Sequence, residues 1–153
     1  MENNYKSSSH VQRQAEAIIF QKVMEQLHIN LESNPKIYIG NNGSTYIQPD
    51  FYSAEHFVVG EIFAHIGKPK KAQDNKIAND ILKMLLLQEA TGRLYRKILV
   101  VCDLTEKEHL EGKSVLAESI RRFGVEILYI ELADEIQKQI LQAQELQKMT
   151  NAE

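Results

Sequence analysis

Two carboxylates stand out in the segment IQPDFYSAEHFVVGEIFAHIG, which covers residues 47–67. Asp50 directly follows a proline, and Glu61 lies in the middle of an apolar run. Removing the partner of a buried charge costs several kcal/mol, on the order of 3–5. A carboxylate in the centre of a buried strand therefore indicates either a face that is open to water or a cation close by.

The spacing of the two carboxylates predicts that they meet. We expect a long strand from His56 to about Ile66, and both of its faces are mainly apolar, which is typical of a central strand covered on both sides. The turn after the preceding strand, about Thr45 to Asp50, brings Asp50 close to residues 59–61 of the long strand. Two carboxylates at such a distance repel each other unless a proton or a metal ion lies between them.

A third acid and two lysines occupy helical stripes. Glu16 shares its stripe with the apolar residues Phe20, Val23 and Leu27, so it is predicted to face the core. Its alternative explanation is a position near a helix start, where the helix dipole favours acids. A later stripe holds Lys76, Asp80, Lys83 and Leu87. Its alternative is an exposed flank with an Asp80–Lys83 pair that contributes only about 0.2–0.5 kcal/mol.

The elements that must position these residues follow from periodicity and turn residues. The predicted order is α-β-β-β-α-β-α-β-α, a three-layer α/β domain with a mixed central sheet of about five strands. Asn42-Gly43 predicts a tight hairpin. One domain is expected over residues 1–153, with disorder at residues 1–9 and at the last few. The predicted helices cover residues 10–28, 74–91, a segment ending at 123, and 134–149, and the strands 36–40, 45–50, 56–66, 97–103 and 125–132.

Composition narrows the class of protein. Apolar residues make up 43% and charged residues 25% of the 153, as in ordinary globular domains. The net charge of −3 argues against coating nucleic acid by charge alone, and the lysines of GKPKKAQDNK fit a solvated loop. No apolar run is long enough to span a membrane, the N-terminus lacks the apolar core of a signal peptide, and the single cysteine, Cys102, fits a reducing cytoplasm. We therefore expect a cytoplasmic protein with no membrane partner.

Together these residues resemble the PD-(D/E)xK nuclease superfamily, which has the restriction-endonuclease-like fold. The family core, α-β-β-β-α-β, is similar to residues 10–103, some two-thirds of the chain. The family motif reads here Pro49-Asp50, ten intervening residues, and then Glu61-Ile62-Phe63. The resemblance implies Mg²⁺- or Mn²⁺-dependent phosphodiester hydrolysis of DNA. It also implies that Asp50, Glu61 and Ile62 hold the metal and that Glu16 assists.

The sequence departs from the family at Phe63, where the motif lysine should stand. In some branches of the family this lysine has migrated to the following helix, and Lys83 fits that variant. Lys76 and Lys68 are further candidates for this role, and His65 is a later alternative. Two carboxylates suit Mg²⁺ or Mn²⁺ rather than zinc, and a lysine would stabilise the charge that develops on the phosphate.

Two other functions stay open at this point. A nuclease fold that lost its lysine could bind nucleic acid or a protein partner without turnover. Alternatively, Asp50 and Glu61 could face solvent in an α/β interaction protein that is not a nuclease. The chain has no room for a separate target-recognition domain, so sequence-specific double-strand cleavage would need a homodimer or a larger protein partner. Stabilisation by Mg²⁺ or Mn²⁺ would separate the last possibility from the others.

Overall fold

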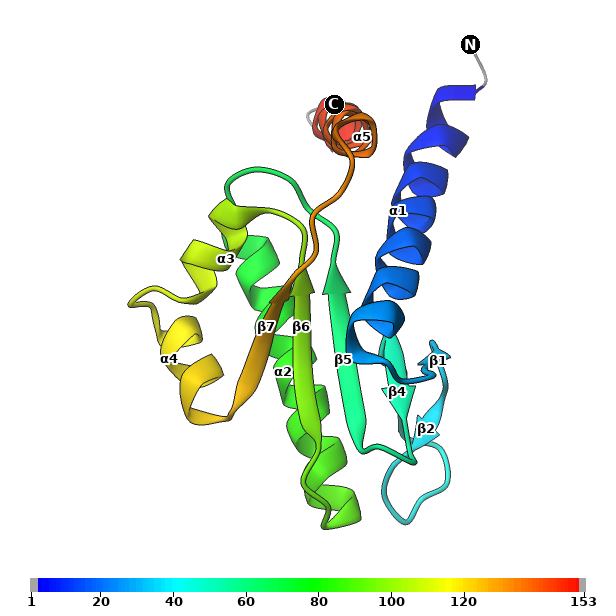
Figure 1. Ribbon diagram of the computed structural model, residues 1–153, viewed down its shortest axis with the longest axis vertical. Coiled ribbons are helices and arrows are strands. Elements are labelled where there is room, and N and C mark those ends of the chain that lie inside the picture. The colour runs from blue at the N-terminus through cyan, green and yellow to red at the C-terminus, as the bar shows by residue number, and fades with distance from the viewer. Residues whose placement is uncertain (1–2, 152–153) are drawn as a thin grey trace.

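The computed structural model describes residues 3–151, with the side chains of residues 9–150, and it is a three-layer α/β fold (Figure 1). A mixed five-stranded sheet has the order β1-β4-β5-β6-β7, which confirms the predicted fold class. The helices are α1 (Asn3–Leu27), α2 (Lys71–Thr91), α3 (Leu104–Leu110), α4 (Val115–Arg122) and α5 (Asp134–Asn151). The strands are β1 (Glu32–Ser33), β2 (Ile37–Tyr38), β3 (Tyr46–Ile47), β4 (Phe51–Ser53), β5 (Val58–Phe63), β6 (Arg96–Val101) and β7 (Val125–Tyr129).

The centre of the sheet is parallel, as the long apolar runs of β5 and β6 predict. β5 pairs with β6 and β6 with β7 in parallel, through the crossovers that α2 and the α3–α4 pair provide. β4 runs antiparallel to β5, with Phe51 opposite Gly60. This register leaves little space, because a Cβ at Gly60 would meet the Phe51 ring closer than 3.0 Å. Glycine at position 60 thus permits the close pairing of β4 with β5 next to the candidate site.

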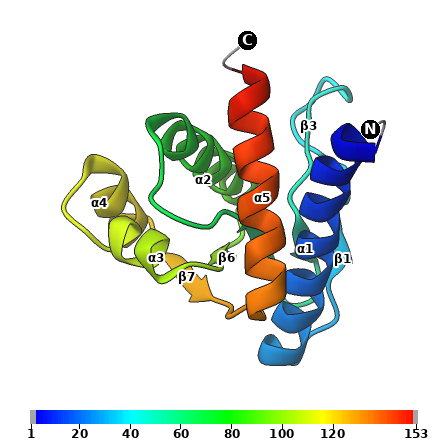
Figure 2. The same ribbon diagram turned by 90° about the horizontal axis from the view of Figure 1, so that it is seen from above.

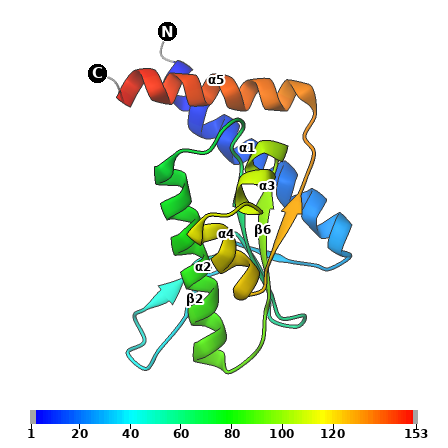
Figure 3. The same cartoon turned by 90° about the vertical axis from the view of Figure 1, so that its left-hand side faces the viewer.

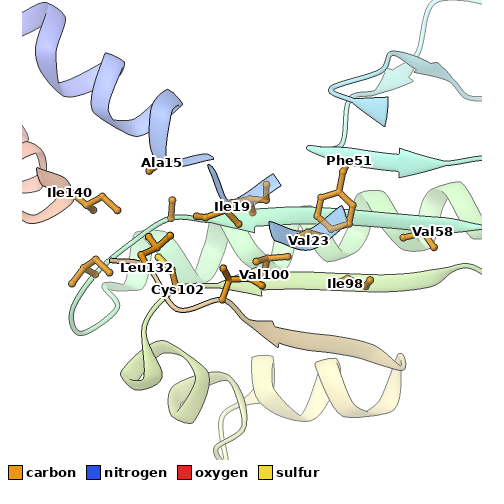
Figure 4. Close-up of a cluster of buried hydrophobic side chains, with 14 residues drawn as sticks. Ala15, Ile19, Val23, Phe51, Val58, Ile98, Val100, Cys102, Leu132 and Ile140 are labelled. Carbon is orange, nitrogen blue, oxygen red and sulfur yellow. The ribbon is translucent and has the colours of Figure 1, made fainter. Parts of the chain in front are cut away.

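Two apolar cores hold the layers together. One face of the sheet packs against α1, and α5 lies beside α1 and adds Ile140 to the same core (Figure 2). The opposite face packs against α2, α3 and α4. Figure 4 shows the first core, in which side chains of α1, β4, β5, β6 and α5 interdigitate. Its labelled members are Ala15, Ile19, Val23, Phe51, Val58, Ile98, Val100, Cys102, Leu132 and Ile140.

The hairpin before Pro49 departs from the prediction. β2 and β3 form a separate two-stranded sheet that projects beside α2 (Figure 3), and the outer strand of the main sheet is instead β1. Of the strand predicted from Thr45 to Asp50, only Tyr46 and Ile47 form a strand, β3, and residues 48–50 divide it from β4. Pro49 lies at the division, and a proline cannot donate to a ladder, so the chain changes partner there. Tyr46 and Asp50 therefore do not share the face of one strand.

Two helix predictions also change. The helix expected from His10 begins at Asn3, so residues 3–9, which were expected to be disordered, continue it; residues 1, 2, 152 and 153 lie outside the described residues. The single helix predicted to end at Phe123 is divided into α3 and α4. Helix α3 ends at Leu110, and α4 begins after Ser114, whose hydroxyl caps it by accepting a hydrogen bond from the N–H of Ala117. Within the described ranges, no helix is both long and apolar enough to cross a membrane.

Candidate metal centre

Asp50 directly precedes β4, and its side chain points toward β5. Its Oδ2 accepts the backbone N–H of Ile62 at 2.6 Å. Its own carbonyl accepts the N–H of Asn34, so its backbone points the other way, toward β1. The carboxylate is thus fixed against the sheet edge by a short charge-assisted hydrogen bond rather than left free in solvent.

The pairing of β4 with β5 explains why Asp50 and Glu61 are neighbours. Continuing the register by one pair beyond Phe51 and Gly60 places Asp50 opposite Glu61, and a second step places Pro49 opposite Ile62. Residues opposite each other in an antiparallel pair share a face of the sheet. The N–H and carbonyl of Ile62 point toward β4, where Asp50 takes the N–H and Pro49 has no N–H to offer the carbonyl. This leaves the Ile62 carbonyl available as an oxygen ligand.

Glu61 is the buried charge that the sequence made conspicuous. It is 6% exposed, and its Oε1 has no hydrogen-bond partner among the described residues. Burial raises the pKa of Glu61 to about 9, and the charges of Asp50 and Asp80 push it in the same direction. Lys83 opposes the shift without cancelling it. Without a bound cation, Glu61 therefore carries a proton at neutral pH.

Asp80 is the site residue that sequence reasoning missed. The sequence places it on the stripe with Lys76 and Lys83, and the alternative of an exposed flank is wrong for Asp80, which is 8% exposed. Burial raises the pKa of Asp80. The charges of Lys83 and Lys76 oppose this rise, and the charge of Asp50 adds to it. Asp80 thus belongs to the same electrostatic cluster as Asp50 and Glu61. The available signal was an acid one helical turn before the candidate lysine.

Lys83 lies at the candidate site but is engaged by a neighbour. Its Nζ is 3.4 Å from Oδ1 of Asp80, and it also acts electrostatically on Glu61. Both interpretations of the helix stripe thus describe part of the structure: the Asp80–Lys83 pair forms, and it forms beside the carboxylates. Lys76 is exposed, yet its charge reaches both Glu16 and Asp80. Lys83 and Lys76 are therefore the two lysines whose charges lower the pKa values of the acids at this site.

Glu16 approaches from the other side of the sheet edge. It is partly buried on α1, accepts a hydrogen bond from Gln12 Nε2 at 3.3 Å, and lines a cavity of about 320 Å³ together with Asp50 and Ile62. Burial raises the pKa of Glu16, Gln12 opposes this, and the Asp50 charge adds to it. Arg13, one turn earlier on α1, lines the same cavity and supplies a cation that the sequence did not single out.

Two other positions considered for the motif lysine, Phe63 and Lys68, place no cation at the Asp50–Glu61 site. Phe63 stacks on the ring of His65, with centroids 5.5 Å apart and planes 15° apart, so its side chain is an aromatic spacer and offers no charge. Lys68 lines a different cavity, between the loop after β5 and helix α5, in which His65 also takes part. The loop after β5 thus carries Lys68 and His65 to a second location.

The donor set fits a hard divalent cation. Asp50 and Glu61 offer carboxylate oxygens, Ile62 offers a carbonyl, and the partnerless Oε1 of Glu61 is a buried acceptor that requires a proton or a cation. Among the side chains of residues 9–150, no three His, Cys, Asp or Glu converge closely enough to make a ready metal cage. Carboxylates completed by a backbone carbonyl and water suit Mg²⁺, which keeps several of its waters in proteins.

Comparisons with known proteins found no relative of this chain. No family model, curated protein or solved structure matches the chain.

Proposed function

We propose that this protein is a metal-dependent nuclease that hydrolyses phosphodiester bonds in DNA, with a PD-(D/E)xK-type site. The observation that carries the proposal is the buried Oε1 of Glu61, which has no partner among the described residues and lies among the charges of Asp50 and Asp80, with Lys83 nearby. A buried carboxylate oxygen without a partner, next to the charges of Asp50 and Asp80, lowers stability, and a divalent cation would remove that cost.

Each residue has a task that follows from its position. Asp50 and Glu61 would hold Mg²⁺ or Mn²⁺ together with the Ile62 carbonyl, and the bound ion would polarise the phosphodiester and supply an ionised water. Asp50 is oriented for this by the Ile62 N–H. Asp80 holds the Lys83 ammonium close to the Glu61 side of the sheet edge, where it would stabilise charge on the scissile phosphate. Glu16 and Arg13 line the neighbouring cavity, where they would orient water and bind a substrate phosphate.

Cleavage of plasmid and of linear DNA under Mg²⁺ and under Mn²⁺ tests the proposal. Asp50→Asn removes one charge but keeps the shape of the side chain, and it is expected to abolish cleavage. Lys83→Ala is expected to lower the rate by about 10²–10³, the scale of a lost oxyanion donor. Lys113→Ala, in the α3–α4 connection, is the matched control and should cleave like the unmutated protein. Full activity in Lys83→Ala would transfer the role of the cation to Lys76 or Arg13.

One observation favours a second candidate function, binding of nucleic acid without turnover. Phe63 occupies the position of the motif lysine and stacks on His65, and Lys83 is held by Asp80. If Lys83 cannot leave Asp80 and Lys76 does not take its place, no lysine reaches the scissile phosphate. In that case the unmutated protein binds DNA and is stabilised by Mn²⁺, but it cleaves no substrate.

A further inference from the structure

A second cavity, of about 620 Å³, lies where the chain leaves β5. Its walls are the β5–α2 loop, which contributes His65, Lys68 and Lys70, and the C-terminal half of α5, which contributes Lys148. Figure 1 shows this loop crossing the end of the sheet beneath α5. Pockets that bind small molecules start at about 300 Å³, and this cavity has about twice that volume. It therefore has room for more than one small ion.

The walls of this cavity are pinned by polar contacts. Gln144 of α5 accepts the N–H of Ile66 at 3.0 Å and donates to the carbonyl of the same residue at 2.8 Å. The N–H of Gly67 donates to Asp103 Oδ2 at 2.9 Å. Loop and helix are therefore held at a fixed separation, and a ligand would enter a site that already has its shape.

The lining is cationic. Lys68, Lys70 and Lys148 face one acid, Glu145, and none of the three lysines forms an ion pair with any described residue. Three ammonium groups around one cavity repel one another and attract an anion. A surface whose overall charge is −3 thus concentrates positive charge at this point.

His65 adds an oriented ring to the same wall. Its Nδ1 lies 2.8 Å from Oε1 of Glu106, which is 0% exposed and whose other oxygen has no partner among the described residues. The ring also stacks on Phe63. Nε2 of His65 makes no hydrogen bond within the part of the chain that the structure describes, and it is not a buried atom. The ring is thus held by Glu106 with its second nitrogen left for a ligand, and in the imidazolium form that nitrogen donates to an anion.

We infer that this cavity binds a backbone phosphate of the DNA strand whose cleavage is assigned to the Asp50–Glu61 site, an inference that rests on that proposed function. His65 follows Glu61 by four positions on the same continuous segment, which is about 13 Å at strand spacing. Along the axis of a DNA duplex, which rises about 3.4 Å per base pair, this distance corresponds to about four base pairs. The cavity would therefore fix the position of the strand relative to the metal centre.

The salt dependence of DNA binding without any metal tests the inference. Fluorescence anisotropy of a labelled duplex over a series of salt concentrations gives the slope of log K against log salt. Each lysine that neutralises a phosphate contributes about 0.9 to that slope. Lys70→Ala and Lys148→Ala are each expected to lower the slope by about that amount. Lys138→Ala is the matched control, since Lys138 is exposed on the same helix α5 but does not line the cavity.

The outcomes separate this inference from the proposed cleavage. Selective loss of slope in Lys70→Ala and Lys148→Ala supports the phosphate site, even if the unmutated protein never cleaves. An equal loss in Lys138→Ala, or no loss in Lys148→Ala while cleavage persists, overturns the site alone. NMR of the His65 ring distinguishes the ligand: a response to inorganic phosphate with none to the duplex would assign the cavity to small phosphate compounds and overturn the backbone assignment.

Discussion

Replacing Glu61 by glutamine should make the metal-free protein more stable at neutral pH. Glutamine has the shape of a protonated glutamate, so Glu61→Gln keeps the packing and removes the titration. The pKa of Glu61 is raised from 4.5 to about 9 by burial and by the charges of Asp50 and Asp80. At pH 7 the folded chain therefore keeps a proton on Glu61 that the unfolded chain has released.

The sign and size of the effect follow from this difference. Below about pH 4.5 both states are protonated, and Glu61 costs nothing. As the pH rises from 4.5 toward 9, the unfolded state is favoured by about 1.4 kcal/mol for each unit, so the free energy of unfolding falls. At pH 7 the accumulated loss is about 3 kcal/mol, which Glu61→Gln should recover. At pH 4 the variant and the unmutated protein should be nearly equal.

Urea unfolding at pH 4, 7 and 9 without metal measures the difference. Glu55→Gln is the control, because Glu55 is an exposed acid and its change should stay within about 0.5 kcal/mol. With Mg²⁺ or Mn²⁺ at about 100 times its Kd, the unmutated protein should gain about 2.7 kcal/mol, and Glu61→Gln should gain much less. A gain from Glu61→Gln that does not vary with pH, or a loss of stability at pH 7, would refute the reasoning about burial and repulsion.

Two further predictions concern the fold. Gly60→Ala should lower the free energy of unfolding by about 1–3 kcal/mol, because its Cβ would press on the ring of Phe51; urea unfolding measures this, and an unchanged midpoint would refute the close packing. Lys97→Met should leave the free energy of unfolding unchanged or raise it by about 1 kcal/mol, because Lys97 is buried beside Gln88 without a carboxylate, and burial lowers its pKa. Gln88 keeps the N–H of Tyr95 as a donor, so a loss above about 2 kcal/mol in the same assay would contradict this account.

The sequence by itself determined the parallel centre of the sheet and the neighbourhood of the two conspicuous acids. Long apolar runs separated by helical segments permit only buried strands joined by crossovers, and β5, β6 and β7 are parallel for that reason. Asp50 and Glu61 lie on consecutive strands around a short turn, so their meeting depends on local chain geometry alone. Such contacts can be read from spacing because few alternative arrangements exist.

The tertiary structure decided which polar side chains join those acids. A helical stripe shows that Asp80 and Lys83 share a flank, but only the packing of α2 on the face of the sheet makes Asp80 buried. The division of the predicted strand at Pro49 likewise depended on β1 taking the outer place in the main sheet. In each case the competing arrangement satisfies the same local pattern, and long-range contacts choose between them.

The second cavity is the clearest case of this kind. Glu106 and His65 are 41 positions apart, and Gln144 is 78 positions from Ile66. Periodicity within one element carries no information about such pairs, because they form only when α3 packs on the sheet and α5 packs over the loop after β5. The proximity of Asp50 and Glu61, which depends on one turn and two strands, could therefore be predicted from the sequence. The second cavity, which is assembled from distant elements, could be found only in the tertiary structure.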